Sequence, residues 1–194
     1  NIVLMTITIM ASLYIIEIGI TFFDPKNIKT GIERDRENVN KQVKFARQLG
    51  IEFDKRLKID VVRDFRNDGI DAVPVIHPSF LLESEGVTIG STKLFPFGGV
   101  SKITTVGRNE SGKFGVYMSD RYGFNNNDNF WENNTVNWFL VGDSMVHGSS
   151  VQTDETISGN IISITNESVI NVGYGGNGPL IELGSLVEYT KEIT

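Results

Sequence analysis

The chain has 194 residues, 40% of them apolar and 22% charged, so it is long and apolar enough to bury a core. The net charge of −6 disfavours nonspecific nucleic-acid binding, which needs an excess of basic residues. There is no cysteine, and there are two histidines, His77 and His147. This excludes a disulfide scaffold, a thiolate or histidine-rich metal site and a cysteine nucleophile.

The first segment, residues 1–23, is apolar with Glu17 as its one formal charge. Its length matches the roughly 20 residues that a helix needs to cross a bilayer. We therefore expect a transmembrane or signal anchor over residues 2–23. A buried core helix or a pair of strands is the alternative.

Residues 24–69 are rich in charges of both signs and predict a helical stalk. Apolar residues recur at helical spacing up to Leu49, and Gly50 is a natural stop. A second, shorter helix is expected over Leu57–Arg66, before Gly69.

Residues 70–130 predict a small β-rich segment. The last two of its four short β-like runs flank a glycine-bounded loop, which is typical of a hairpin. In the fourth run, Phe114, Val116 and Met118 alternate with more polar positions, so we expect them to face the core. The four runs are Val87–Ile89, Lys93–Phe97, Ser101–Val106 and Lys113–Met118.

Residues 131–194 repeat the order strand, loop, helix, which is typical of an α/β fold with a parallel sheet. The expected strands are the apolar runs Trp138–Val141 and Ser168–Val172. A helix should begin near Thr153 or Asp154, and another should begin at Pro179. The apolar face of the last helix should consist of Leu180, Leu183, Leu186 and Val187.

The loop after the first of these strands, Gly142–Gly148, places Ser144 between a strand and a helix. Ligands of open α/β sheets bind at that edge, and a following helix offers unpaired N–H groups to a developing oxyanion. The position therefore suits a nucleophilic serine, although Gly-Asp-Ser is also a common turn sequence.

Two blocks and an upstream element resemble the SGNH (GDSL-like) hydrolases, in particular their membrane-anchored bacterial members. Val141–Gly148 resembles the first block of the family, Val169–Gly178 the second, and Ser119–Asn125 an element that often precedes such domains. The resemblance covers about residues 119–190. It implies a flavodoxin-like α/β/α domain with a parallel sheet, of which residues 131–194 are the N-terminal half.

The resemblance further implies a serine ester hydrolase that acts through an acyl-serine intermediate, with carbohydrate O-acyl esters as one substrate class. Ser144 would be the nucleophile, and the backbone N–H of Gly176 would stabilise the oxyanion. No metal or organic cofactor is implied. The implied location is a bacterial inner membrane, with residues 2–23 as the anchor and the domain outside the cytoplasm.

The oxyanion asparagine and the catalytic Asp and His of the family have no counterpart in the chain. A serine hydroxyl is a weak nucleophile without a base. We therefore expect the sequence to be truncated on its C-terminal side and inactive alone. We expect His147 to be a partly exposed residue that shapes the pocket, His77 to be a loop or packing residue, and Asp143 to bond neighbouring amides.

Two other functions stay open. Gly173–Gly178 matches the dinucleotide-binding pattern G-x-G-x-x-G between a strand and a helix. The chain could also be a non-catalytic, membrane-tethered module. The partners expected are a small-molecule or carbohydrate ester and the membrane, but no nucleic acid, and the sequence does not set the oligomeric state.

Overall fold

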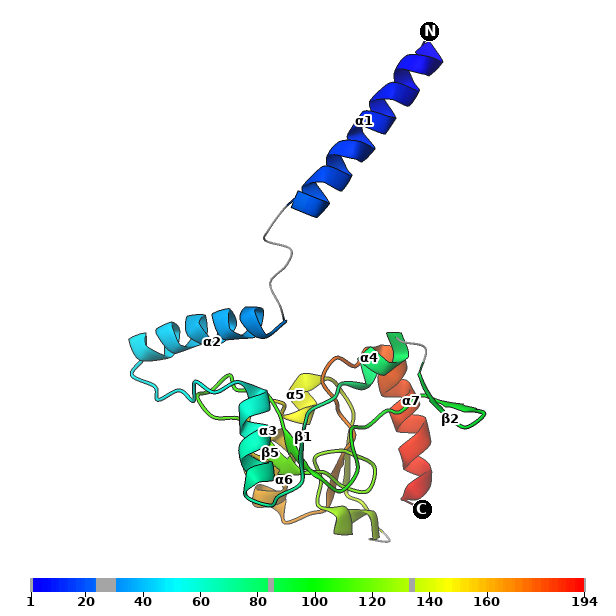
Figure 1. Cartoon of the computed structure of the whole chain (residues 1–194). Coiled ribbons are helices and arrows are strands. Elements are labelled where there is room, and N and C mark those ends of the chain that lie inside the picture. The colour runs from blue at the N-terminus through cyan, green and yellow to red at the C-terminus, as the bar shows by residue number, and fades with distance from the viewer. Residues whose placement is uncertain (1, 24–30, 84–85, 133–134, 194) are drawn as a thin grey trace. The chain divides into compact units, whose positions relative to one another are not determined.

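The computed structural model describes residues 2–23, 31–83, 86–132 and 135–193, and side chains for residues 5–17, 31–81, 86–132 and 135–193 (Figure 1). Within these ranges the fold is mixed α/β, with small sheets and seven helices. The helices are α1 (Ile2–Phe23), α2 (Gly31–Gln48), α3 (Lys58–Asn67), α4 (Pro78–Glu83), α5 (Ser144–His147), α6 (Ile157–Thr165) and α7 (Pro179–Tyr189). The strands are β1 (Ala72–Pro74), β2 (Val87–Ile89), β3 (Thr92–Leu94), β4 (Thr104–Val106), β5 (Val116–Met118), β6 (Trp138–Leu140) and β7 (Val169–Asn171).

The chain divides into two compact units, Asn1–Lys41 and Gln42–Thr194. The first unit contains α1, whose described side chains are all exposed. Among the described residues, no helix combines the length and the hydropathy of a bilayer-spanning segment. The anchor expected over residues 2–23 is therefore not supported by the structure, and membrane attachment stays a prediction from the sequence.

Both helices predicted within the stalk, residues 24–69, form in the structure, as α2 and α3. Residues 24–30 lie outside the described residues, and the unit boundary at Lys41 falls within α2. Helix α3 lies beside β1 in Figure 1. Its residues Val61 and Val62 are buried with Ala72 and Val106, so α3 belongs to the core of the second unit.

Strands β4 and β5 form the predicted antiparallel hairpin, and β1 joins it as a parallel neighbour of β4. The prediction that Met118 of β5 faces the core is wrong. Tyr117 is buried, whereas Met118 is 61% exposed. Tyr117 points inward because its hydroxyl lies 3.0 Å from Nε2 of the buried His147.

Strands β6 and β7 pair in parallel, with Leu140 opposite Asn171. β7 is fully buried, whereas β6 is only half-buried, because the main core is built around Ile170 and Val172. That core also contains Val75, Phe124 and Trp131, so residues 70–130 and 131–194 share one hydrophobic core.

Two helical expectations in this region need correction. A 3-10 turn occupies Thr153–Glu155, and α6 begins after Thr156, whose hydroxyl accepts the N–H of Gly159 at 2.9 Å. Helix α7 begins at Pro179 as predicted, but its expected apolar face is exposed. Instead Gly184 packs against Phe97 and Ser185 is buried, because small residues let α7 approach its neighbour closely.

Candidate functional site

Ser144 is the first residue of α5 and follows β6 after a three-residue loop. Asp143 caps the helix, since its Oδ1 accepts the N–H of Met145 at 3.0 Å, as expected for a structural turn residue. Gly148 ends α5 in the left-handed conformation, with φ of 71°. Ser144 is half-buried, and among the described residues no hydrogen bond of its hydroxyl is recorded.

Ser144 lines a pocket of about 320 Å³, together with Ser149, Thr156 and the charged Arg108. This volume is at the lower end of the range for small-molecule sites. A larger pocket, of about 530 Å³, lies beside Phe65 and Phe114 and contains none of these residues. The pocket at Ser144 is therefore small, and it carries charge of both signs from Arg108, Glu110 and Glu155.

The loop after β7, Gly173–Gly178, lies against the loop after β6. Tyr174 donates its backbone N–H to the carbonyl of Gly142 at 3.0 Å. Val146 of α5 packs against Gly173, where an added Cβ would lie 2.7 Å from its Cγ1. Gly176 is exposed with φ of +83°, but it does not line the pocket of Ser144. Among the described residues, no recorded contact joins Gly176 to Ser144.

His147 is not the partly exposed residue that the sequence suggested; it is 1% exposed. Its Nδ1 lies 3.0 Å from the hydroxyl of Ser149, and its Nε2 lies 3.0 Å from the hydroxyl of Tyr117. The ring also stacks on Tyr174. Burial lowers the pKa of His147 to about 4, so the ring is neutral at pH 7. Because both ring nitrogens have partners, His147 is not placed to activate Ser144.

His77 reaches the second loop from 98 residues away. Its Nδ1 lies 2.7 Å from the carbonyl oxygen of Gly175, and only a protonated nitrogen can bond there, which leaves Nε2 unprotonated in the neutral ring. Burial lowers the pKa of His77. The sequence offered no signal for this contact beyond two prolines around the histidine.

The same contacts bear on dinucleotide binding. An added Cβ at Gly175 would lie 2.6 Å from the His77 ring, and one at Gly176 would lie 2.8 Å from the Ser79 hydroxyl. In a dinucleotide site, glycines of such a loop let the backbone approach a pyrophosphate. Here the His77 ring fills the space beside Gly175, the second glycine of the pattern, which disfavours that function.

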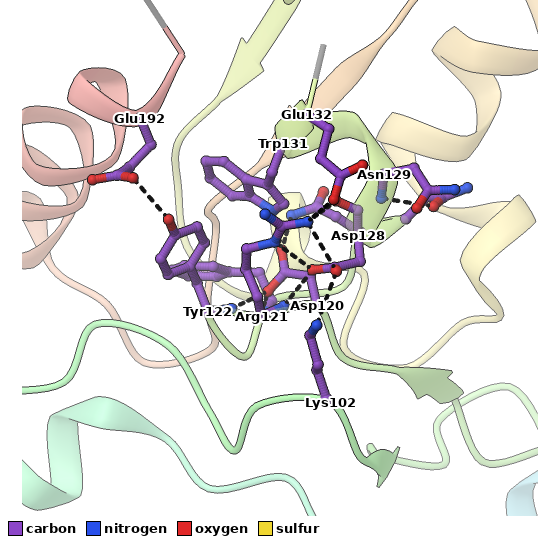
Figure 2. Close-up of polar contacts among 12 residues, drawn as sticks. Lys102, Asp120, Arg121, Tyr122, Asp128, Asn129, Trp131, Glu132 and Glu192 are labelled. Atoms are coloured by element: carbon purple, nitrogen blue, oxygen red, sulfur yellow. Dashed lines mark hydrogen bonds and ion pairs between the residues drawn. The ribbon is translucent and has the colours of Figure 1, made fainter.

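Asp120 is a buried charged group with 0% exposure. Figure 2 shows its polar contacts. Its Oδ1 accepts the backbone N–H groups of Tyr122 and Phe124, both at 2.9 Å. Its Oδ2 accepts the side chains of Asn126 and Trp131, both at 2.8 Å. Burial raises the pKa of Asp120, although the four donors favour the ionised form.

An ion cluster lies next to Asp120 in Figure 2. Arg121 pairs with Asp128 at 2.9 Å and with Glu132 at 2.9 Å, and Lys102 lies 3.3 Å from Asp128. The Arg121 guanidinium lowers the pKa of Asp128 to about 2. These groups are partly exposed, so they make a solvated cluster beside the buried one.

Among the described residues, no group of three or more His, Asp or Glu side chains could hold a metal ion. Comparisons of the chain with models of protein families, with curated proteins and with solved structures found no match.

Proposed function

We propose that the chain carries the nucleophile of an SGNH-type serine ester hydrolase, built on a flavodoxin-like sheet, and that Ser144 is that nucleophile. The supporting observation is the position of this half-buried residue. Ser144 follows the first of two parallel strands and lines a pocket of about 320 Å³. Ligands of open α/β sheets bind at this edge of the strands.

In this proposal, the Ser144 oxygen attacks the carbonyl carbon of an ester, and its proton passes to a base. The backbone N–H of Ser144 stabilises the negative oxygen of the tetrahedral intermediate. A second donor, the backbone N–H of Gly176, comes from the resemblance alone, since Gly176 does not line this pocket. The alcohol leaves, and water then releases the acid from the acyl-serine. The small pocket suits esters of short acyl chains, with O-acylated carbohydrates as one class.

The base of this reaction is not assigned. Both ring nitrogens of His147 are engaged, and among the described residues no side chain bonds the Ser144 hydroxyl. This observation favours a second candidate function, a non-catalytic module. The two candidates differ in one measurable property, the turnover of an activated ester.

The deciding experiment is the hydrolysis of p-nitrophenyl acetate by the full-length protein that contains this chain, as the wild type, as Ser144→Ala and as the control Ser163→Ala. Ser163 lies exposed on α6. We expect Ser144→Ala to fall to the uncatalysed rate and Ser163→Ala to match the wild type. A fluorophosphonate should label Ser144, as mass spectrometry of the peptides would show. No turnover by the wild type would favour the non-catalytic module, and turnover by Ser144→Ala would exclude Ser144.

A further inference from the structure

Asn171, the last residue of β7, is 1% exposed and bonds two parts of the candidate site. Its Nδ2 donates to the carbonyl of Val146 in α5 at 2.6 Å. Its Oδ1 accepts the backbone N–H of Gly173 at 2.9 Å, in the loop that bears Gly176. One side-chain amide thus links the helix of Ser144 to the loop of the expected oxyanion donor.

Asn171 is itself held from the other side by Asn126. The Asn126 Oδ1 accepts the N–H of Asn171 at 2.8 Å, and its Nδ2 donates to the carbonyl of Asn171 at 2.9 Å. The Asn126 side chain therefore bonds the backbone of β7 at Asn171 as a neighbouring strand would. Because the Asn126 Nδ2 also donates to Asp120 at 2.8 Å, the orientation of its amide is fixed.

Helix α5 needs such support, because it has four residues and isolated helices of that length are not stable. Other contacts also hold α5: Val146 packs against Gly142 and Gly173, and the His147 ring bonds the hydroxyl of Tyr117 in β5. The first contact is apolar and not directional, and the second ties α5 to β5. Among the described residues, the bond from Asn171 to Val146 is therefore the one that provides directional control over where α5 lies relative to β7.

We propose that Asn171 is a positioning residue, held by Asn126, that sets the place of Ser144 relative to the Gly173–Gly178 loop. This inference rests on the proposed function. Asn171 touches neither substrate nor the attacking oxygen in this role. Its effect should appear in turnover more than in substrate binding, since a displacement of about 1 Å can cost about 100-fold in rate.

The test is Asn171→Asp, which replaces the donor to Val146 with an oxygen and keeps the acceptor for Gly173. At pH 8 an ionised carboxylate would face the Val146 carbonyl and push α5 away. On acidification the introduced carboxyl group gains a proton and can donate to Val146 again. We expect kcat for p-nitrophenyl acetate to fall about 10- to 100-fold at pH 8 with KM nearly unchanged, and the ratio to wild type to recover towards pH 5.

Asn171→Ser is the matched control, because its shorter uncharged side chain loses the bond without adding a titrating group. It should lose kcat at every pH, and it keeps the test decisive if Asn171→Asp does not fold at pH 8. Wild-type kcat in Asn171→Ser, or no pH recovery in a folded Asn171→Asp, would overturn the positioning role while Ser144→Ala stayed inactive. Turnover by Ser144→Ala would instead remove the proposed function and this role with it.

Discussion

Two aspartates that adjoin a serine in the sequence have opposite environments in the structure. Asp143 of Asp143-Ser144 is exposed and accepts one backbone N–H, that of Met145. Asp120 of Ser119-Asp120 is fully buried and accepts four N–H groups. The residue types are the same, and the number of donors that converge on the carboxylate differs.

The difference separates two tasks within one core. At Asp143 the carboxylate only caps the start of α5, and the serine beside it lines a pocket. At Asp120 the carboxylate gathers the turn at Tyr122–Phe124, the indole of Trp131 and the amide of Asn126. We infer that the turn at Asp120 stabilises the core on which the turn at Asp143 presents the hydroxyl of Ser144.

The largest effect is expected from Asp120→Ala. The substitution removes the acceptor of four N–H groups, three of them buried, and each unsatisfied buried group costs about 1–3 kcal/mol. We expect the free energy of unfolding to fall by about 4 kcal/mol or more, measured by urea denaturation. The matched control, Asp143→Ala, removes an exposed cap and should cost about 1 kcal/mol. Similar losses at the two positions would contradict the division of tasks.

His147 gives the next effect, through pH. Its pKa in the folded chain is about 4, below the ordinary 6.5, so the unfolded chain binds more protons between these values. The free energy of unfolding should therefore fall as the pH drops from 6.5 to 4, by about 3 kcal/mol in total. Buried His77 acts in the same direction, whereas the raised pKa of Asp120 favours the folded chain at low pH.

Urea denaturation between pH 7 and pH 4.5 measures this slope, and NMR of the two histidine rings assigns it. His147→Gln should flatten the slope, because glutamine does not titrate. A ring of His147 that titrates near 6.5 in the folded protein would show that it is not buried as described.

The elements that could be predicted from the sequence are those set by local signals. The α5 turn, the β4–β5 hairpin and the start of α7 follow from glycine, proline and apolar runs close in the chain. Ser144 and Asp143 stand where the motif placed them. Which face of β5 is buried could not be predicted, because Tyr117 bonds His147, which lies 30 residues further along the chain.

The supports of the candidate site were also beyond local reasoning. Asn126 and Asn171 are 45 residues apart, and His77 and Gly175 are 98 apart. Asparagine and histidine in loops usually indicate turns or solvated surface, and nothing in their spacing shows which backbone groups they meet. The donors to the buried carboxylate of Asp120, by contrast, all lie within 11 residues of it in the chain.

The smallest effect is expected from Asp128→Asn, which weakens the ion cluster beside Asp120. Because folding lowers the pKa of Asp128, its ionised carboxylate stabilises the fold above pH 3.8. This stabilisation is lost as the pH falls towards 2. Because the pair with Arg121 is partly exposed, solvent screens it, and we expect a loss of less than about 1 kcal/mol.

The loss should shrink further in 1 M NaCl, where the Debye length is about 3 Å. Asp120→Ala should keep its full effect in the same salt, because its carboxylate lies away from solvent ions. Equal salt dependence at Asp120 and Asp128 would mean that the two carboxylates share one environment, against the contrast drawn from their burial.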